Sequence, residues 1–262
     1  MSGGDPGAPE KEPETGRPEE PYRGELRGRF SRAIFPFATW LAAQLTIPFI
    51  LTVFFLLNRT RVYGRSRIPM RPNTLLLSNH QSMIDSFLLV FVAFFPRELF
   101  EPRLLPWHPA AEENFFRNRF YTWVFSMLKC IPVRPGRRDL KAIHRSLRAL
   151  RDGTMILFPE GTRSRDGSVG RGRPGAGLVL LGTGATVIPV TITGLDRVLP
   201  IGSIVPRVGN RVRVYFGRPV DYSDLADLPP SRETAQEAVD RVMERIRFQR
   251  RVIERIEGRG RV

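Results

Sequence analysis

The sequence predicts an α/β fold in which helices cover a mixed sheet, preceded by a hydrophobic helical anchor. Three observations support this prediction. Short apolar runs of strand length alternate with longer helical segments along the chain. An uncharged apolar stretch comes before the first expected strand. The length of 262 residues and the apolar content of 42% suit one domain with appendages.

Four segments are expected along the chain. Residues 1–25 are rich in Gly, Pro and Glu and lack apolar periodicity, which predicts a disordered tail. Residues 26–58 are expected to form a membrane-anchoring helical segment, residues 59–230 the main domain and residues 231–262 a C-terminal amphipathic helix. That helix places four apolar residues on one face: Val239, Val242, Met243 and Ile246.

The apolar pattern also predicts the individual strands and helices. Residues 73–78 form a short apolar run opened by the turn-prone sequence Arg71-Pro72-Asn73, which is typical of a buried strand. Residues 154–157 form a second run of this kind. Further strands are expected at residues 61–64, 129–134, 186–192 and 211–217, and helices near residues 82–95, 114–128, 138–151 and 231–256.

The anchor lies in the uncharged stretch of residues 33–57. A straight helix of that length would reach roughly 37 Å, more than the ~30 Å hydrocarbon thickness of a bilayer, so it is long enough to span. Pro36, Pro48 and the polar Gln44 instead favour a broken helix, either a hairpin embedded in the membrane or an interfacial anchor. A buried core helix is the third alternative. Arginines flank both ends, which weakens the positive-inside rule as a guide to orientation.

The charge of the chain indicates a polyanionic partner. The formal net charge is +15 and the sequence pI is near 11.2. Nucleic acid would satisfy this charge, but no helix-turn-helix, zinc-finger spacing or aromatic RNA-binding motif supports it, and no nucleic-acid partner is expected. An anionic bilayer explains the charge equally well, since basic residues near a membrane each contribute about 1 kcal/mol of attraction.

The cysteine and histidine content predicts neither a disulfide nor a metal site. Cys130 is the single cysteine and the chain has three histidines, which argues against an internal disulfide or structural zinc. His108 and His144 have no carboxylate at a useful spacing, so both are expected to be surface or capping groups. The main domain is expected to face the cytoplasm.

A histidine and a carboxylate follow the first buried strand. In the sequence Asn79-His80-x4-Asp85, the aspartate would lie in the first turn of the next helix, where the helix dipole keeps it ionised, with Ser82 as the helix cap. It could accept a hydrogen bond from one ring nitrogen of His80 and leave the other free to take a proton from a hydroxyl. The alternative is a purely structural role for all these residues.

A second motif, Phe158 to Ser164, follows the strand at residues 154–157 and suits an anion. Gly161 allows close backbone approach, Thr162 and Ser164 offer hydroxyls, and Arg163 offers a planar fork of donors that matches phosphate. Arg134 ends a third apolar run. Because ligands gather at the carboxyl ends of strands in open α/β sheets, the three motifs are expected to share one crevice.

Together these motifs resemble the glycerolipid acyltransferase family, which includes 1-acyl-sn-glycerol-3-phosphate (lysophosphatidic acid) acyltransferases. The resemblance covers roughly residues 60–220. Its blocks occur in the family's order: Asn79-His80-x4-Asp85, Ile131-Pro132-Val133-Arg134, Phe158 to Ser164, and Val187-Ile188-Pro189-Val190.

The resemblance implies a glycerol-phosphate acyltransferase-like sandwich and a role for each site residue. His80 would deprotonate the acceptor hydroxyl and Asp85 would orient it. Arg173 replaces a lysine that commonly faces the substrate in the family. The substrate-binding set implied is Asn79, Ser82, Arg134, Glu160, Gly161, Thr162, Arg163, Ser164 and Arg173.

The reaction implied is transfer of a fatty acyl group to lysophosphatidic acid, giving phosphatidic acid, without a cofactor. The donor would be an acyl thioester, either acyl-CoA or acyl-carrier protein, because the block Glu-Gly-Thr-Arg-Ser at residues 160–164 resembles users of those carriers. Residues 105–116 and 129–133 look more like the tafazzin branch, which moves acyl chains between phospholipids. A lysophospholipid remodelling acyltransferase or transacylase is therefore the alternative, and a non-catalytic basic protein a third. Helix 82–95 is expected to be core, with an acyl channel as the other interpretation.

Overall fold

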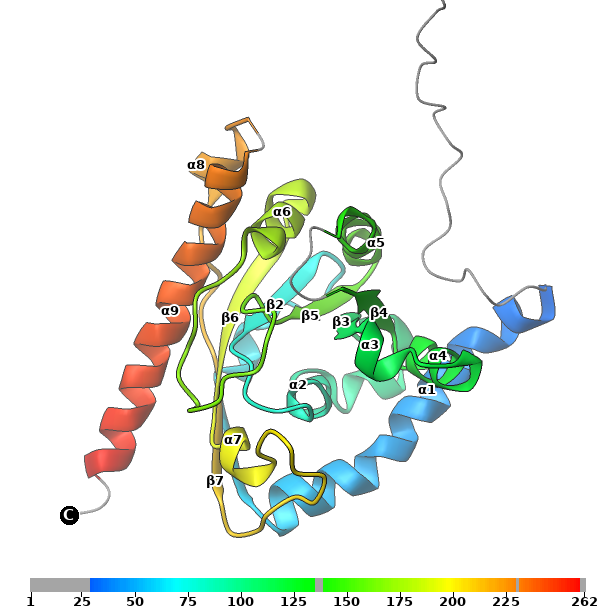
Figure 1. Cartoon of the computed structure of the whole chain (residues 1–262), viewed down its shortest axis with the longest axis horizontal. Helices are drawn as coiled ribbons and strands as arrows, with labels where there is room; N and C mark the ends of the chain where they lie inside the picture. Colours follow the sequence, from blue (N-terminus) through cyan, green and yellow to red (C-terminus); the bar gives the residue numbers. More distant parts are fainter. Residues whose placement is uncertain (1–28, 135–138, 230, 260–262) are drawn as a thin grey trace, which may run out of the picture.

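The computed structural model describes residues 29–134, 139–229 and 231–259. The expected tail, residues 1–25, lies outside the described residues. Within them, the secondary structure alternates between strands and helices (Figure 1), as the apolar pattern predicts.

The main sheet has five strands in the order β1-β7-β6-β2-β5. All neighbouring pairs are parallel except β6 and β7, which are antiparallel, so the prediction of a mixed sheet is confirmed. The inner strand β2, between β6 and β5, is buried at every position, as its apolar Leu75-Leu76-Leu77 run requires. The strands are β1 (Arg59–Tyr63), β2 (Thr74–Ser78), β5 (Thr154–Leu157), β6 (Thr186–Thr193) and β7 (Arg211–Phe216).

Helices cover both faces of this sheet and form two separate cores. One core joins the sheet to the N-terminal helices and α2, and the other joins it to α6 and α9. Figure 1 shows α5, α6 and α9 on one side and α1, α2 and α7 on the other. These helices are α1 (Arg29–Ile50), α2 (Asp85–Phe94), α5 (Leu140–Arg151), α6 (Pro174–Thr183), α7 (Leu195–Val198) and α9 (Arg232–Arg259), with the short α8 (Ser223–Ala226) before α9.

A second, two-stranded parallel sheet lies beside the main one. It consists of β3 (His108–Ala111) and β4 (Cys130–Val133), with α3 (Glu112–Phe115) and α4 (Arg119–Met127) between them in the chain. Strand β3 was not expected from the sequence, because it contains only four residues, one of them a proline. The prediction of a single helix near residues 114–128 is wrong, because this segment contains the two helices α3 and α4. The side chain of Asn118 caps α4 by accepting the N–H of Tyr121 at 3.0 Å.

The N-terminal apolar segment forms one continuous rod without a reversal of the chain. Helix α1 runs through Pro48 and continues as the π-helix η1 (Leu51–Leu56). The hairpin, one of the alternatives that the sequence left open, is therefore not formed. Residues 37–56 are long and apolar enough to cross a membrane by length and composition.

Helix α6 packs very closely against α9. Its glycine-rich sequence was not predicted to be helical, because glycine has low helix propensity. A Cβ added at Gly177 would lie 1.8 Å from the carbonyl oxygen of Ala235, so only glycine fits at this crossing. Helix α9 buries its expected apolar face, Val239, Val242, Met243 and Ile246, against the sheet and α6. That part of the sequence prediction is confirmed.

Candidate active site

The register of two neighbouring strands brings the first two motifs together. Strands β2 and β5 run parallel with Leu77 opposite Leu157, so His80 and Glu160 leave the same edge of the sheet three residues later. The backbone N–H of His80 donates to Oε1 of Glu160 at 3.1 Å. The ring of His80 stacks on Phe158, with the ring centres 4.1 Å apart. The motifs therefore meet at the carboxyl end of the sheet, where a ligand is expected.

His80 and Asp85 form a hydrogen-bonded pair. Nδ1 of His80 lies 2.8 Å from Oδ2 of Asp85, and the carboxylate also accepts the backbone N–H groups of Gln81 at 2.6 Å and Ser82 at 3.0 Å. Because the carboxylate is an acceptor in all these contacts, Nδ1 carries the hydrogen and Nε2 presents a lone pair. Asp85 is fully buried, whereas the side chain of His80 is 21% exposed. This geometry suits a general base held by a carboxylate.

The rest of the loop at residues 79–82 is fixed by contacts within the protein. The side-chain amide of Asn79 pairs with both backbone groups of Ile192, at 2.9 and 2.8 Å. Ser82 donates its hydroxyl to the carbonyl of Leu199 at 2.8 Å. Both side chains are fully buried and hold the loop, whereas the sequence predicted that they bind the substrate. Ser82 is also not the helix cap, since α2 begins only at Asp85.

Gln81 was missed by the sequence reasoning and has a similar positioning role. Its side-chain amide donates to the carbonyl of Gly167 at 3.2 Å and accepts the N–H of Leu195 at 3.1 Å. Gln81 therefore joins the histidine loop to the loop at residues 166–173. No local pattern marks this role, because its partners lie 86 and 114 residues away.

Glu160 is a structural centre between the two loops. Its carboxylate accepts the N–H of His80 through Oε1 and the N–H of Gly170 through Oε2, the latter at 3.2 Å. Burial raises the pKa of Glu160, while the two N–H donors act in the opposite direction. The carboxylate is thus engaged by the backbone, which differs from the phosphate-site role implied by the resemblance.

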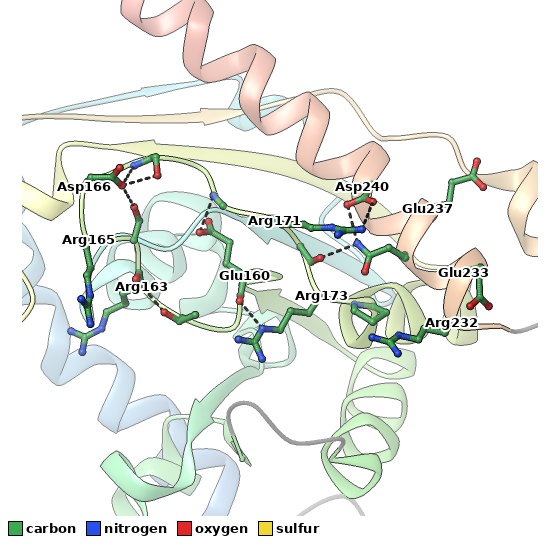
Figure 2. A pocket seen from close by; sticks show the side chains of 17 residues that line it. Glu160, Arg163, Arg165, Asp166, Arg171, Arg173, Arg232, Glu233, Glu237 and Asp240 are labelled. Atoms are coloured by element: carbon green, nitrogen blue, oxygen red, sulfur yellow. Dashed lines mark hydrogen bonds and ion pairs between the residues drawn. The ribbon is translucent and has the colours of Figure 1, made fainter.

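A cavity of about 1000 Å³ lies between the loop after β5 and the start of α9 (Figure 2). It is lined by five of the expected substrate residues: Glu160, Thr162, Arg163, Ser164 and Arg173. The Nε of Arg173 donates to the carbonyl of Glu160 at 3.1 Å. Gly161 precedes these residues with a φ of +68°, a conformation that favours glycine.

The charged groups of this cavity are segregated. Figure 2 shows the guanidinium groups of Arg163, Arg165 and Arg173 on the side away from α9, whereas Asp240 lies on α9 and Arg232 is its first residue. Asp240 is near Arg171, at 3.9 Å, and Glu237 is paired with Arg241 at 2.7 Å. Within the described part of the chain, the side chains of Arg163, Arg165 and Arg232 form no hydrogen bond or ion pair. Unpaired guanidinium groups of this kind are suited to a phosphate.

Arg165 was missed by the sequence reasoning. It follows Arg163 by two residues and lines the same cavity. The carboxylate of neighbouring Asp166 accepts hydrogen bonds from the hydroxyls of Ser168 and Ser164, at 2.6 and 2.9 Å, and these hydrogen bonds lower its pKa. The repeated Arg-x-Arg spacing in this loop is the signal that could have identified Arg165.

Arg134 lies outside this cavity. Its Nε donates to Glu112 at 2.7 Å, and its side chain is 63% exposed. The ion pair raises the pKa of Arg134, chiefly through the hydrogen bond that Arg134 donates to Glu112. The expectation that three motifs share one crevice is therefore not met for Arg134, because β4 belongs to the second sheet and does not extend the first. The other two motifs meet at the edge of the main sheet, but only the second of them lines the cavity.

A second cavity, of about 40 Å³, lies between α1, α2 and the β3–β4 sheet. It is lined by Phe87 and Val90 of α2, but its volume is far below the ~300–1000 Å³ of typical ligand pockets. Helix α2 is therefore mainly core in this conformation. Lys129 at the edge of the cavity donates to the carbonyls of Pro102 and Leu105, and burial lowers its pKa to about 8.

His108 was expected to be a surface or capping group, but it is half-buried. Its Nε2 lies 3.1 Å from Sγ of Cys130, and Nδ1 is shielded from solvent. Burial lowers the pKa of His108 to about 4 and raises the pKa of Cys130, so both are neutral packing groups at neutral pH. The described residues contain no cluster of three or more side chains that could hold a metal ion.

Comparison with known proteins identifies the family. The sequence profile described as "Acyltransferase" matches residues 59–193, just over half of the chain. The chain therefore belongs to the acyltransferase family. The matched region contains the His80 and Asp85 pair and the whole loop that carries Arg163.

Several curated proteins are similar in sequence. The chain is 27% identical over 208 residues to a chloroplastic 1-acyl-sn-glycerol-3-phosphate acyltransferase of Brassica napus, covering 78% of this chain and 55% of the relative. It is 29% identical over 170 residues to N-acylphosphatidylethanolamine synthase of Arabidopsis thaliana (61% and 58% covered) and 30% identical over 186 residues to tafazzin of Drosophila melanogaster (66% and 49%). The chain thus spans about half the length of these relatives.

The fold is similar to that of a solved structure, PlsC from Thermotoga maritima, a 1-acyl-sn-glycerophosphate (LPA) acyltransferase. The TM-score is 0.62 and the sequence identity 24%, with 88% of this chain and 85% of the other covered. At this identity the likeness bears on the fold alone.

Proposed function

We propose that the chain transfers a fatty acyl group from an acyl thioester to the free hydroxyl of lysophosphatidic acid, giving phosphatidic acid. The observation that carries this proposal is the His80–Asp85 pair, at 2.8 Å, at the sheet edge that also carries the arginine-lined cavity. Two of the relatives described as 1-acyl-sn-glycerol-3-phosphate acyltransferases support the choice of acceptor.

In the proposed reaction, Nε2 of His80 takes the proton of the acceptor hydroxyl as its oxygen attacks the thioester carbonyl. The new C–O bond forms, the C–S bond breaks, and the proton passes from His80 to the departing thiolate. Asp85 stabilises the imidazolium that exists between these steps and fixes the ring through Nδ1. No covalent acyl-enzyme is needed.

The negative charge that develops on the carbonyl oxygen needs hydrogen-bond donors. Several nearby N–H groups are already engaged, since those of Gln81 and Ser82 bind Asp85 and that of Gly161 binds the carbonyl of Phe158. The N–H groups of Thr162 and Arg163 have no acceptor within the described residues. We assign the oxyanion to these two groups.

The acceptor phosphate is assigned to the unpaired arginines of the cavity. Arg163 and Arg165 lie in the loop that Ser164 ties to His80, because the N–H of Ser164 donates to the carbonyl of His80 at 2.8 Å. A phosphate bound by these guanidinium groups would hold the lysophosphatidic acid beside the base. Arg173 extends the same positive surface, and the acyl chain of the acceptor would remain in the membrane.

The donor is the open part of the proposal. Acyl-CoA and acyl-carrier protein both supply a thioester, and neither requires a cofactor or a metal. The similarity to tafazzins favours a second candidate function, in which a phospholipid donates the acyl group directly. In that reaction the leaving group is a glycerol oxygen, and His80 would return the proton to it.

One assay separates these functions. The purified full chain is incubated with lysophosphatidic acid and one donor at a time: acyl-CoA, acyl-carrier protein or a diacyl phospholipid. Phosphatidic acid formed only with a thioester supports the proposal and names the carrier. Transfer from phospholipid alone would replace it with the transacylase, and absence of transfer from every donor would refute both.

A further inference from the structure

We propose that three segments far apart in the sequence form one face that rests on an anionic lipid bilayer, with α1 lying in the membrane surface and not crossing it. The segments are the outer side of α1 and η1, the aromatic side of α4, and the loop of residues 201–208. We call them the docking face. The proposal concerns a surface outside the candidate active site and does not depend on the acyl donor.

The outer side of α1 is an apolar stripe without a partner. Phe37, Leu41, Leu45 and Phe49 recur every four residues and are all exposed, Leu45 to 73%. Leu56 continues the stripe along η1 and is 79% exposed. On the opposite side of the rod, Ile50, Val53 and Phe54 are buried in one of the hydrophobic cores. A stripe of this size needs a nonpolar medium, which water does not provide.

The packing of α1 argues against a membrane-crossing helix. Helix α1 lies along the domain and contacts both α2 and α4 (Figure 1). A crossing helix would draw these elements into the hydrocarbon core. The exposed arginines Arg117 and Arg119, which lie at the start of α4, would then be drawn towards it, at a high cost in free energy. A helix that buries one side in protein and shows the other side to the headgroups avoids this cost.

Helix α4 adds an aromatic patch beside α1. Phe120, Tyr121 and Trp123 are exposed, Phe120 to 66%, and their rings contact one another. Tyrosine and tryptophan side chains favour the interface between lipid and water, because one part of the ring is apolar and the other forms hydrogen bonds. Exposed arginines, Arg117 and Arg119, precede the patch.

The loop of residues 201–208 is the third segment and lies at the other end of the rod. Ile204, Val205 and Val208 are exposed, Ile204 to 90%. The loop is tied to the end of η1, because the N–H of Gly209 donates to Leu57 at 2.8 Å and Asn58 donates to the carbonyl of Arg207 at 3.1 Å. The apolar tip is therefore continuous with the stripe on α1 and η1.

The charges around these segments identify an anionic surface as the occupant. The chain contains 26 Asp and Glu in 262 residues, about one in ten, yet residues 26–84, 114–138 and 197–220 contain none. All three segments of the docking face lie in these carboxylate-free regions, and each includes or adjoins exposed arginines. Apolar side chains beside exposed arginines match a bilayer with anionic headgroups.

Binding to vesicles tests the loop, which the sequence alone did not connect with a membrane. The full chain is sedimented with phosphatidylcholine vesicles that contain phosphatidylglycerol. We expect I204D/V205D to lower the partition coefficient at least about tenfold and V208D about threefold, because each carboxylate must leave water and meets anionic lipid. The matched control is F248D, a comparably exposed aromatic position on α9, and it should bind as the parent does.

A labelling experiment tests the orientation of α1. A thiol label is attached to F37C or L56C; the native Cys130 is buried and does not react. A soluble quencher on the side of the sealed vesicles to which the protein was added should quench both labels. Both labels should also lie at the same shallow depth in the bilayer. Labels on opposite sides would show that α1 crosses the bilayer and would overturn the proposal.

Two further outcomes would also overturn it. If I204D/V205D keeps its native circular dichroism and binds vesicles as the parent does, the loop does not touch lipid. If light scattering shows that the parent is a dimer without lipid and that this variant is a monomer, the face is covered by a second copy of the chain instead.

Discussion

Asp85 is the residue on which the geometry of the candidate base depends. Its buried carboxylate accepts hydrogen bonds from the His80 ring and from two backbone N–H groups, so it fixes the side chain and the loop together. These contacts use Oδ2, and Oδ1 also accepts the N–H of Ser82 at 3.0 Å, so an amide would place a second donor against one of these N–H groups. We therefore expect the His80–Asp85 pair to be disturbed even by a substitution that conserves the shape of Asp85 and removes its charge.

Substitution of this pair should abolish transfer without abolishing binding. We expect His80→Ala and Asp85→Asn to lower kcat by about 10²–10⁴, because general-base catalysis contributes a factor of this order. Turnover with lysophosphatidic acid and the active donor measures the effect. His144→Ala, which changes an exposed histidine on α5, is the matched control. Normal turnover by a folded His80→Ala protein would refute the base assignment.

Arg163 should act mainly in acceptor binding. Because its guanidinium is unpaired at the cavity wall, we expect Arg163→Ala to raise the acceptor KM by about 10- to 100-fold with a smaller change in kcat. Arg163→Lys should recover only part of the loss, since an ammonium cannot donate two parallel hydrogen bonds. Steady-state kinetics with varied lysophosphatidic acid measures both. Arg151→Ala, at an exposed end of α5, should leave KM unchanged; an equal effect there would point to general electrostatics.

At the scale of elements, α9 positions the loop that lines the cavity. Gln236 donates to the carbonyl of Gly172 at 2.9 Å, and Arg247 donates to the carbonyl of Gly170 at 2.9 Å. The same loop is joined to the histidine loop through Glu160 and Gln81. Because α9 is itself held against the sheet by its packing on α6, this packing also helps to hold the loop that lines the cavity.

Two glycines of α6 provide a matched test of this packing. Gly177→Ala should lower the free energy of unfolding by about 1–3 kcal/mol, because its Cβ would overlap the carbonyl of Ala235. Gly175→Ala should be neutral or stabilise by about 0.5–1 kcal/mol, since a Cβ there meets no atom within 4 Å and alanine favours helix. Urea denaturation of both variants measures the difference. Equal stabilities would show that the two helices separate easily.

At the scale of the whole molecule, the small β3–β4 sheet should make stability depend on pH. Burial lowers the pKa of His108 from 6.5 to about 4, so the folded state disfavours its protonation. The stability that follows from this shift is fully present above pH 6.5 and is lost as the pH falls towards 4, up to roughly 3 kcal/mol in total.

The contribution of His108 can be separated from that of the carboxylates. The free energy of unfolding is measured between pH 7 and pH 4.5 for the parent and for His108→Asn, which does not titrate. The loss on acidification should be smaller in the variant. Parallel curves for the two proteins would show that the ring becomes protonated without unfolding the sheet.

Most of the fold could be predicted from the sequence, because its signals are local. The apolar run at residues 73–78 has the length of a strand, and α9 repeats its apolar residues with the helical period. The elements that were missed, β3 and α6, have weak local preferences and exist through their neighbours. Glycine is needed at residue 177 because a larger residue would overlap Ala235 of α9, which is a tertiary contact and not a local helix preference.

The sequence by itself determined the family and the order of the motifs, since residue type and spacing along the chain carry that information. The tertiary structure decided which motif residues meet. Parallel register places Glu160 beside His80, whereas Arg134 belongs to another sheet, and Asn79 and Ser82 face inward. It also brought α4 and the loop at residues 201–208 beside α1. The physical reason is that hydrogen-bond register and burial join residues from distant parts of the chain, and local sequence does not record those partners.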